Sequence, residues 1–174
     1  MNKLRDTKTL TLAAMLTAIG IIIGGYLRFP INQLNEIRFA SLPIAMAGMM
    51  LGPIPAAVVG ALVDIGGFIV HPTGAFFPGF TISGAVSGLL YGYILFNKKP
   101  TVTRVIFAQV INTIIIGLGL NTYWLGWMYM KNGYVAALVA RLPKELIMLP
   151  VNIVVYFIVL KSCERFKYLF LKTA

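Results

Sequence analysis

The sequence is poor in charged residues, in cysteine and in histidine. Only 11% of the 174 residues are charged, whereas soluble domains carry about 25%. At 59% hydrophobic content, the chain lacks the polar surface that a water-soluble protein needs on all sides. Cys163 is the sole cysteine and His71 the sole histidine. The sequence therefore excludes an internal disulfide, and it predicts no metal site and no cofactor.

Acidic residues are also scarce, with five against 15 lysines and arginines, which gives a net charge of +10. The basic residues gather in short hinges and tails between apolar runs, the pattern that fixes membrane orientation. A basic face with interleaved aromatic residues, typical of nucleic-acid binders, is missing. Gly74 and Gly79 have the glycine spacing of a phosphate loop, but Phe80 stands where the lysine belongs. Nucleic-acid binding is not expected, and any active transport has to draw its energy from elsewhere.

Long apolar runs predict an all-α fold, a bundle of six transmembrane helices in a single integral membrane domain, residues 1–174. A helix needs about 20 mostly apolar residues to cross a bilayer. The second run is too short to span comfortably, and the prolines around it predict a short, tilted or broken helix followed by a tight turn. The first run exceeds the length of a signal-peptide core and is expected to be retained. The expected helices are Thr9–Leu27, Phe39–Leu51, Pro53–Val70, Gly79–Phe96, Val105–Leu125 and Val135–Leu160.

Six spans place both termini on one side of the membrane, and the distribution of lysine and arginine predicts that this side is the cytoplasm. The protein is accordingly expected in the plasma membrane as a multi-pass protein. Three external loops follow from this topology: Arg28–Arg38, His71–Pro78 and Gly126–Tyr134. The latter two are rich in aromatic residues, glycine and proline, which suits ordered irregular backbone around a cavity.

Charged residues inside the expected spans are the sharpest functional signal. Each costs at least about 2.5–3.5 kcal/mol at a helix centre, so it normally marks a cavity or an ion pair. Asp64 lies well inside the third span, and Arg141, Lys144 and Glu145 lie in the sixth. Arg141 and Glu145 are four residues apart and can pair on one helix face. Two interpretations stay open: ligand-facing groups, or a structural ion pair of Asp64 with Arg141 or Lys144.

Aromatic and amide side chains form a second candidate group. Asn121, Tyr123 and Trp124 lie at the external end of the fifth span, where aromatic residues are also ordinary interfacial anchors. Together with the acid and the cations they would give a flat ring stacking faces and hydrogen-bond partners. The external loops add Phe76 and Phe77, and His71 is a weaker candidate for ligand contact. Arg28 is a further candidate cation for an acidic ligand.

Small residues recur at four-residue spacing along several expected helices, which lets helix backbones approach closely in lipid. In most rows packing within the chain explains the spacing. The first helix carries two successive rows, Ala14 with Ala18 and Gly20 with Gly24. That helix is therefore the best candidate for docking a partner subunit.

Taken together, these features resemble the substrate-binding S components of energy-coupling-factor (ECF) vitamin transporters, in particular the folate-specific kind. The specific part of the resemblance is an Asn-Thr-x-Trp-Leu sequence at 121–125 and an Arg-x-x-Lys-x-x-x-Met-x-Pro sequence at 141–150. Six spans, the basic N-terminus and the Ala14–Ala18 row extend it over nearly the whole chain.

The resemblance implies a membrane-embedded subunit, not an enzyme, that captures a vitamin from outside. It implies partners as well: membrane lipid, a transmembrane scaffold subunit that contacts Ala14 and Ala18, and two cytoplasmic ATPases. The S component would move within the membrane to carry its ligand inward. The implied ligand is folate or a related pterin. Asp64 would hold the pterin, and the aromatic rings of the ligand would stack on Trp124, Tyr123 or the external Phe76 and Phe77.

The anionic tail of folate would meet a cation, and the candidates are Arg28, Arg38, Arg141 and Lys144. Three alternatives remain. The same class of protein could bind riboflavin, biotin or thiamin, since each has a flat or apolar ring. A membrane-embedded enzyme is less favoured, because no nucleophile–base pair or metal site is evident in the sequence. A structural protein without a ligand would leave the buried charges to pair among themselves.

Overall fold

The computed structural model describes the backbone of residues 7–26, 28–30, 36–72, 76–129 and 133–171. Side chains are described for residues 7–26, 39–72, 76–128 and 134–164. Most of the described chain is helical, as the apolar runs predict. The elements in chain order are α1 (Thr7–Tyr26), β1 (Arg28–Pro30), β2 (Glu36–Arg38), α2 (Ser41–Leu51), α3 (Pro53–Val70), α4 (Pro78–Leu95), α5 (Val102–Asn112), the π-helix η2 (Thr113–Leu120), α6 (Asn121–Tyr129) and α7 (Gly133–Leu171).

Each expected span corresponds to a helical rod in the structure. Because α5, η2 and α6 follow one another without a break, they form one rod. Within the described residues, four rods are long and apolar enough to cross a membrane: Thr7–Tyr26, Pro53–Val70, Val102–Met128 and Tyr134–Glu164. The second rod, α2, is a shorter apolar helix of 11 residues, as its sequence predicts. The prediction of a tight turn after it is also confirmed, since Gly52 alone separates α2 from α3 and has a φ of 101°.

Two of the expected loops need correction. The segment Arg28–Arg38, expected as an external loop with no predicted fold, contains the antiparallel strands β1 and β2 with Arg28 opposite Arg38. The segment Gly126–Tyr134 is shorter than expected, because the apolar residues after Gly126 continue helix α6 to Tyr129. Helix α7 likewise continues past the expected end at Leu160, since the lysines and glutamate that follow are good helix formers outside lipid.

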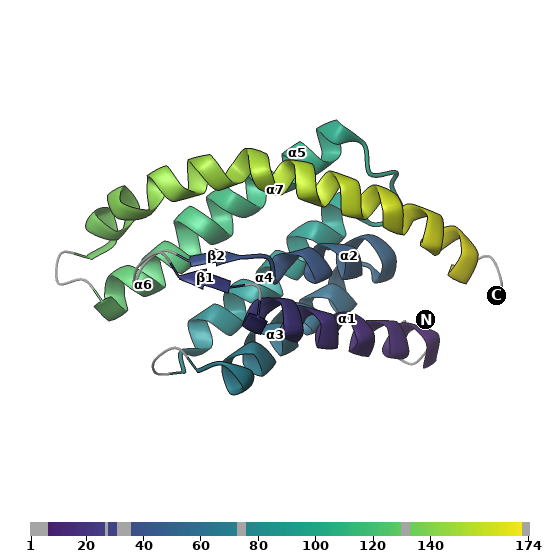
Figure 1. The fold of residues 1–174 in the computed structure, drawn as a ribbon, viewed down its shortest axis with the longest axis horizontal. Helices are drawn as coiled ribbons and strands as arrows, with labels where there is room; N and C mark the ends of the chain where they lie inside the picture. The colour runs from purple at the N-terminus through teal and green to yellow at the C-terminus, as the bar shows by residue number, and fades with distance from the viewer. Residues whose placement is uncertain (1–6, 27, 31–35, 73–75, 130–132, 172–174) are drawn as a thin grey trace.

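Figure 1 shows α7 arching over the other helices, with α1 on the opposite side of the molecule. The start of α1 and the end of α7 lie at the same end of the bundle (Figure 1). The turn between α2 and α3 and the segment between α4 and α5 lie toward this end too. The start of α4 and the junction of α6 with α7 lie at the other end. We refer to these as the terminal end and the distal end.

Glycines bring α3 and α4 into close contact, which is the packing role expected for most of the small-residue rows. A Cβ atom on Gly60 would lie 2.1 Å from the carbonyl oxygen of Gly84, and one on Gly88 would lie 2.1 Å from that of Ala56. A Cβ on Gly92 would lie 2.3 Å from the Cα of Pro53. Backbone contacts this short exclude any side chain at these positions.

The buried apolar core fills the half of the molecule nearer the terminal end. It is built from the second half of α2, the first half of α3, the end of α4, the start of α5 and the middle of α7. Its largest fully buried members are Met49, Val59, Tyr91, Leu95, Val105, Tyr156 and Leu160. This packed half leaves the space between the same helices at the distal end to form a cavity.

Candidate functional site: a cavity at the distal end

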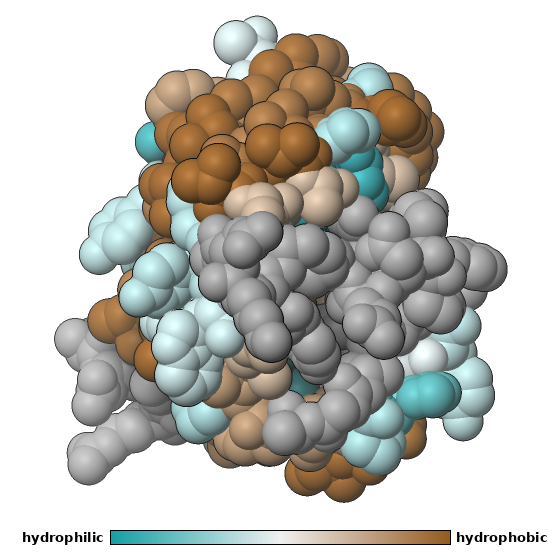
Figure 2. Space-filling view, turned by 90° about the vertical axis from the view of Figure 1, so that its left-hand side faces the viewer, coloured by the Kyte–Doolittle hydropathy of each residue, from teal (hydrophilic) through white to brown (hydrophobic). Residues whose placement is uncertain are grey.

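The described residues line a cavity of about 320 Å³ between α1, α2, α3, α4, the α5–η2–α6 rod and α7. Figure 2 views the molecule from the distal end, and its upper part, where Figure 1 places α7, is largely hydrophobic. Most of the residues that the sequence singles out as candidates lie around this one cavity. Seven of them are among the lining residues: Asp64, His71, Phe76, Phe77, Asn121, Arg141 and Lys144.

Asp64 presents a carboxylate to the cavity from α3. It lies two turns before the end of that helix and is half-buried. Thr81 Oγ1 on α4 donates a hydrogen bond of 2.8 Å to Asp64 Oδ2. Gly84, one turn further along α4, packs beside the Asp64 Cβ. The close α3–α4 contact therefore fixes the carboxylate on one wall of the cavity.

Three charged residues of α7 form a cluster on the opposite wall, which we call the cation cluster: Arg141, Lys144 and Glu145. Arg141 Nη2 lies 3.2 Å from Glu145 Oε1, and Lys144 Nζ lies 2.9 Å from the same oxygen. Arg141 is only 6% exposed. The predicted i, i+4 pair is thus confirmed, and Lys144 joins it. Both cations therefore have Glu145 as an ion-pair partner.

Aromatic rings close the cavity toward the distal end. Phe76 packs edge-on against Phe68, with 5.2 Å between the ring centroids. The ring centroid of Phe77 lies 5.3 Å from that of Trp124 and 5.8 Å from that of Trp127. Trp124 is not itself among the lining residues. It supports Phe77 from behind, while its indole Nε1 donates to Ser83 Oγ at 3.3 Å.

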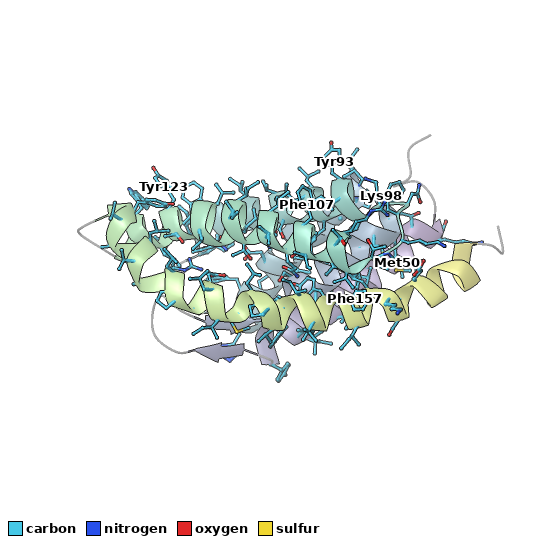
Figure 3. The ribbon with its side chains drawn as sticks, turned by 90° about the horizontal axis from the view of Figure 1, so that it is seen from above. Met50, Tyr93, Lys98, Phe107, Tyr123 and Phe157 are labelled. Atoms are coloured by element: carbon cyan, nitrogen blue, oxygen red, sulfur yellow. The ribbon has the colours of Figure 1, made fainter. Side chains whose placement is uncertain are left out.

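Tyr123 lies outside the cavity. It is 53% exposed, and Figure 3 shows its side chain pointing away from the bundle. This placement suits an interfacial anchor, the other interpretation that the sequence allowed. The backbone of Arg28 belongs to β1, whereas its side chain lies outside the described residues, as does that of Arg38.

Sequence reasoning missed a group of uncharged polar residues at the inner end of the cavity, next to the core. We call it the polar floor: Ser87, Gln109, Asn112 and Asn152. Ser87 Oγ donates to Asn112 Oδ1 at 2.7 Å, and Gln109 Oε1 accepts from the Tyr91 hydroxyl at 3.1 Å. Amides inside apolar spans are themselves costly in lipid. That cost is the signal by which the sequence could have revealed them.

Several polar atoms of the cavity wall have no hydrogen-bond partner among the described residues. They are Gln109 Nε2, Asn121 Oδ1 and Asn152 Oδ1. Buried polar groups are normally paired, so atoms of this kind mark positions where a ligand or water completes the bonding. The cavity thus offers both donors and acceptors besides its charged groups.

The π-helix η2 packs against the cation cluster beside the cavity. Its residues Thr113, Ile116 and Gly117 line the cavity, and the Thr122 hydroxyl donates to the Gly117 carbonyl at 2.8 Å. A Cβ on Gly117 would lie 3.3 Å from Glu145 Oε2. π-Helical segments are rare and frequently occur at functional sites. Here the segment turns a glycine toward the Glu145 carboxylate.

Of the two small-residue rows of α1, the glycine row packs within the bundle and the alanine row lies on its surface. Gly20 packs against Val63 and Gly24 against Ala40, so the glycine row serves packing within the chain. Ala14 and Ala18 are exposed. This leaves an apolar, small-residue face of α1 without cover from the described part of the chain.

The arrangement is that of a binding cavity: one acid, two cations, a wall of aromatic rings and several amides. Among the described residues no group of three or more His, Cys, Asp or Glu side chains could hold a metal ion. The elements of recognition are therefore hydrogen bonds, stacking and charge.

Comparisons with known proteins agree with this picture. The sequence model of the family "ECF transporter, substrate-specific component" matches residues 8–160. The curated folate transporter FolT of Clostridium novyi (strain NT) is 42% identical over 130 residues, which are 75% of each chain. FolT of Leuconostoc mesenteroides subsp. mesenteroides is 31% identical over 163 residues, 90% of this chain and 86% of the relative. A crystal structure of FolT bound with folic acid has a TM-score of 0.81 and 29% identity, covering 90% of this chain and 95% of that one.

Proposed function

The chain belongs to the substrate-specific components of ECF transporters, and from this premise we propose that it captures folate outside the cell and delivers it inward. It is a multi-pass membrane protein and a substrate-binding transport subunit rather than an enzyme. Delivery depends on an ATP-driven complex, in which a scaffold subunit and two cytoplasmic ATPases supply the energy.

The main support for folate as the ligand is that a carboxylate, aromatic rings and cations all surround one cavity. Folate has a flat pterin ring with a hydrogen-bond donor edge, a second aromatic ring and an anionic glutamate tail. The cavity presents the Asp64 carboxylate, the rings of Phe76 and Phe77, and the cations Arg141 and Lys144. Each chemical part of folate thus has a complementary group in the same space.

In the proposed complex, Asp64 accepts two hydrogen bonds from the pterin edge, as an ionised carboxylate does from paired N–H groups. The Thr81 hydroxyl holds the carboxylate in place from the side. Phe77 stacks on the ligand, and Trp124 keeps Phe77 in position. The glutamate tail meets Arg141 and Lys144, His71 contributes from the end of α3, and Arg28 supplies a further cation.

The whole chain acts as one integral domain with both termini in the cytoplasm. This orientation follows from the basic residues that gather at the terminal end, and it turns the cavity toward the outside. The exposed Ala14 and Ala18 on α1 form the face that docks against the scaffold subunit, because small residues let another helix approach closely. Movement of the loaded subunit against that scaffold then carries the ligand inward.

Riboflavin, biotin and thiamin are the competing ligands within the same class of protein. Aromatic rings alone do not distinguish them from folate. An acid on one wall with two cations on the other favours a ligand that has a donor edge and carboxylates, which is the chemistry of folate.

Purification in detergent tests the proposal without any assumption about affinity. The protein would be isolated from cells grown with folate, denatured, and its released small molecules examined by ultraviolet absorption and mass spectrometry. A pterin chromophore in about equimolar amount is expected. Release of a flavin, or of another vitamin instead of a pterin, would refute the assignment of the ligand.

A further inference from the structure

Glu145 is the one acid in the described part of α7 that faces the cavity, and both cations of the cluster bind the same oxygen of it. Arg141 Nη2 and Lys144 Nζ lie 3.2 Å and 2.9 Å from Glu145 Oε1. One negative charge thus meets two positive charges, which leaves the cluster with a formal charge of +1. The group that would receive a ligand's carboxylate therefore already holds a carboxylate from the protein.

The ion pairs of Glu145 with Arg141 and Lys144 lie within α7, so these two pairs do not themselves join two helices. Buried ion pairs gain little net stability, because desolvation of both charges offsets their attraction. On the neighbouring π-helix η2, Gly117 lies against Glu145, and its missing side chain leaves room for the carboxylate. The feature that all three share is the cavity wall.

We propose that Glu145 is an internal stand-in for the carboxylate of the ligand and sets the charge that a ligand has to carry. In the empty protein it neutralises one of the two cations. An entering carboxylate displaces Glu145 Oε1 from Arg141 or Lys144 and takes its place, while Glu145 keeps the other cation. An uncharged ligand gains nothing from the displacement and stays excluded from this subsite. The inference rests on the proposed function, in that the ligand is taken to be a carboxylate-bearing pterin.

The test compares two ligands that differ only in charge: folic acid and its diamide, in which both carboxylates of the glutamate tail are replaced by amides. Dissociation constants would be measured by isothermal titration calorimetry on the full chain in detergent, for the wild type and Glu145→Gln. Glutamine keeps the shape of the side chain and removes the competing charge. Folic acid is expected to bind the variant at least about tenfold more tightly, the low end of measured couplings between close charges. The affinity of the diamide is expected to change by less than about threefold.

Glu164→Gln is the matched control, because Glu164 lies in α7 but is not among the residues that line the cavity. It should leave both dissociation constants unchanged. If Glu145→Gln does not purify as a folded protein, Glu145→Asp gives the same comparison. Its shorter side chain reaches the cations less well, so the gain for folic acid is smaller but has the same direction.

Different outcomes separate this inference from the function on which it rests. A gain confined to folic acid supports the stand-in role. Equal changes for both ligands, or weaker binding of folic acid, would overturn it, because Glu145 would then hold an uncharged part of the ligand or merely position the cations. If the wild type binds neither compound, the proposed function itself is wrong and the inference falls with it.

Discussion

Replacing Asp64 by asparagine is the most informative single change in the binding cavity. Asparagine has nearly the same shape, and its amide oxygen can still accept the 2.8 Å hydrogen bond from Thr81. One carboxylate oxygen, however, becomes an NH₂ group that cannot accept a bond from the pterin edge. A hydrogen bond to a charged group contributes about 1.5–3 kcal/mol, so folic acid should bind about 10- to 150-fold more weakly.

The change can be measured by titrating folic acid into the purified protein and recording the dissociation constant by calorimetry. Thr81→Val is the matched control: it removes the supporting hydroxyl but leaves the carboxylate, so a smaller loss, below about fivefold, is expected. Thermal unfolding without ligand checks that both variants remain folded. A dissociation constant for Asp64→Asn within about threefold of the wild type would refute the assignment of Asp64 to the pterin.

Three further changes probe packing, assembly and the aromatic wall. Gly88→Val should destabilise the protein by about 1–3 kcal/mol or more, because its Cβ would lie 2.1 Å from a backbone oxygen; an unchanged unfolding temperature would contradict the α3–α4 contact. Ala18→Trp on the exposed face of α1 should leave folic acid binding intact and abolish co-purification with the scaffold subunit, whereas retained co-purification would exclude this face. Trp124→Phe should remove most of the fluorescence change on ligand binding and Trp127→Phe little of it, since Trp127 is 72% exposed; the reverse pattern would show that Trp127 reports the ligand.

The sequence predicts the helices well because apolar length is a strong and local signal. Helix α2 is an example: the sequence predicts its short length and the tight turn that follows it at Gly52. The β1–β2 pair could not, since three-residue strands carry little pattern of their own. The extension of α7 was missed because apolar content marks the membrane part of a helix and not its polar continuation.

Within the cavity, the charged residues were predictable and the rotation of the helices was not. Asp64, Arg141 and Lys144 stand out because lipid penalises charge. Tyr123 and Trp124 are neighbours in the sequence, and successive residues on a helix point about 100° apart. Which of the two turns inward depends on the rotation of α6 about its axis. The preceding π-helix alters that rotation, and no sequence pattern predicted it.

The polar floor was missed for a different reason. Gln109 and Asn112 lie on α5 and Asn152 lies on α7, each within a largely apolar stretch of its helix. Only the packing of α4, α5 and α7 brings them to one end of a cavity. Unlike a motif, such a group has no common spacing in the chain.

Equilibrium binding of a small panel of vitamins to the purified protein tests the central claim most directly. Folic acid, riboflavin, biotin and thiamin would each be titrated under the same conditions. The combination of Asp64, the aromatic rings and the cation cluster predicts saturable one-to-one binding of folic acid and no comparable binding of the other three. Binding of riboflavin, biotin or thiamin in preference to folic acid would contradict the proposal that this protein binds folate.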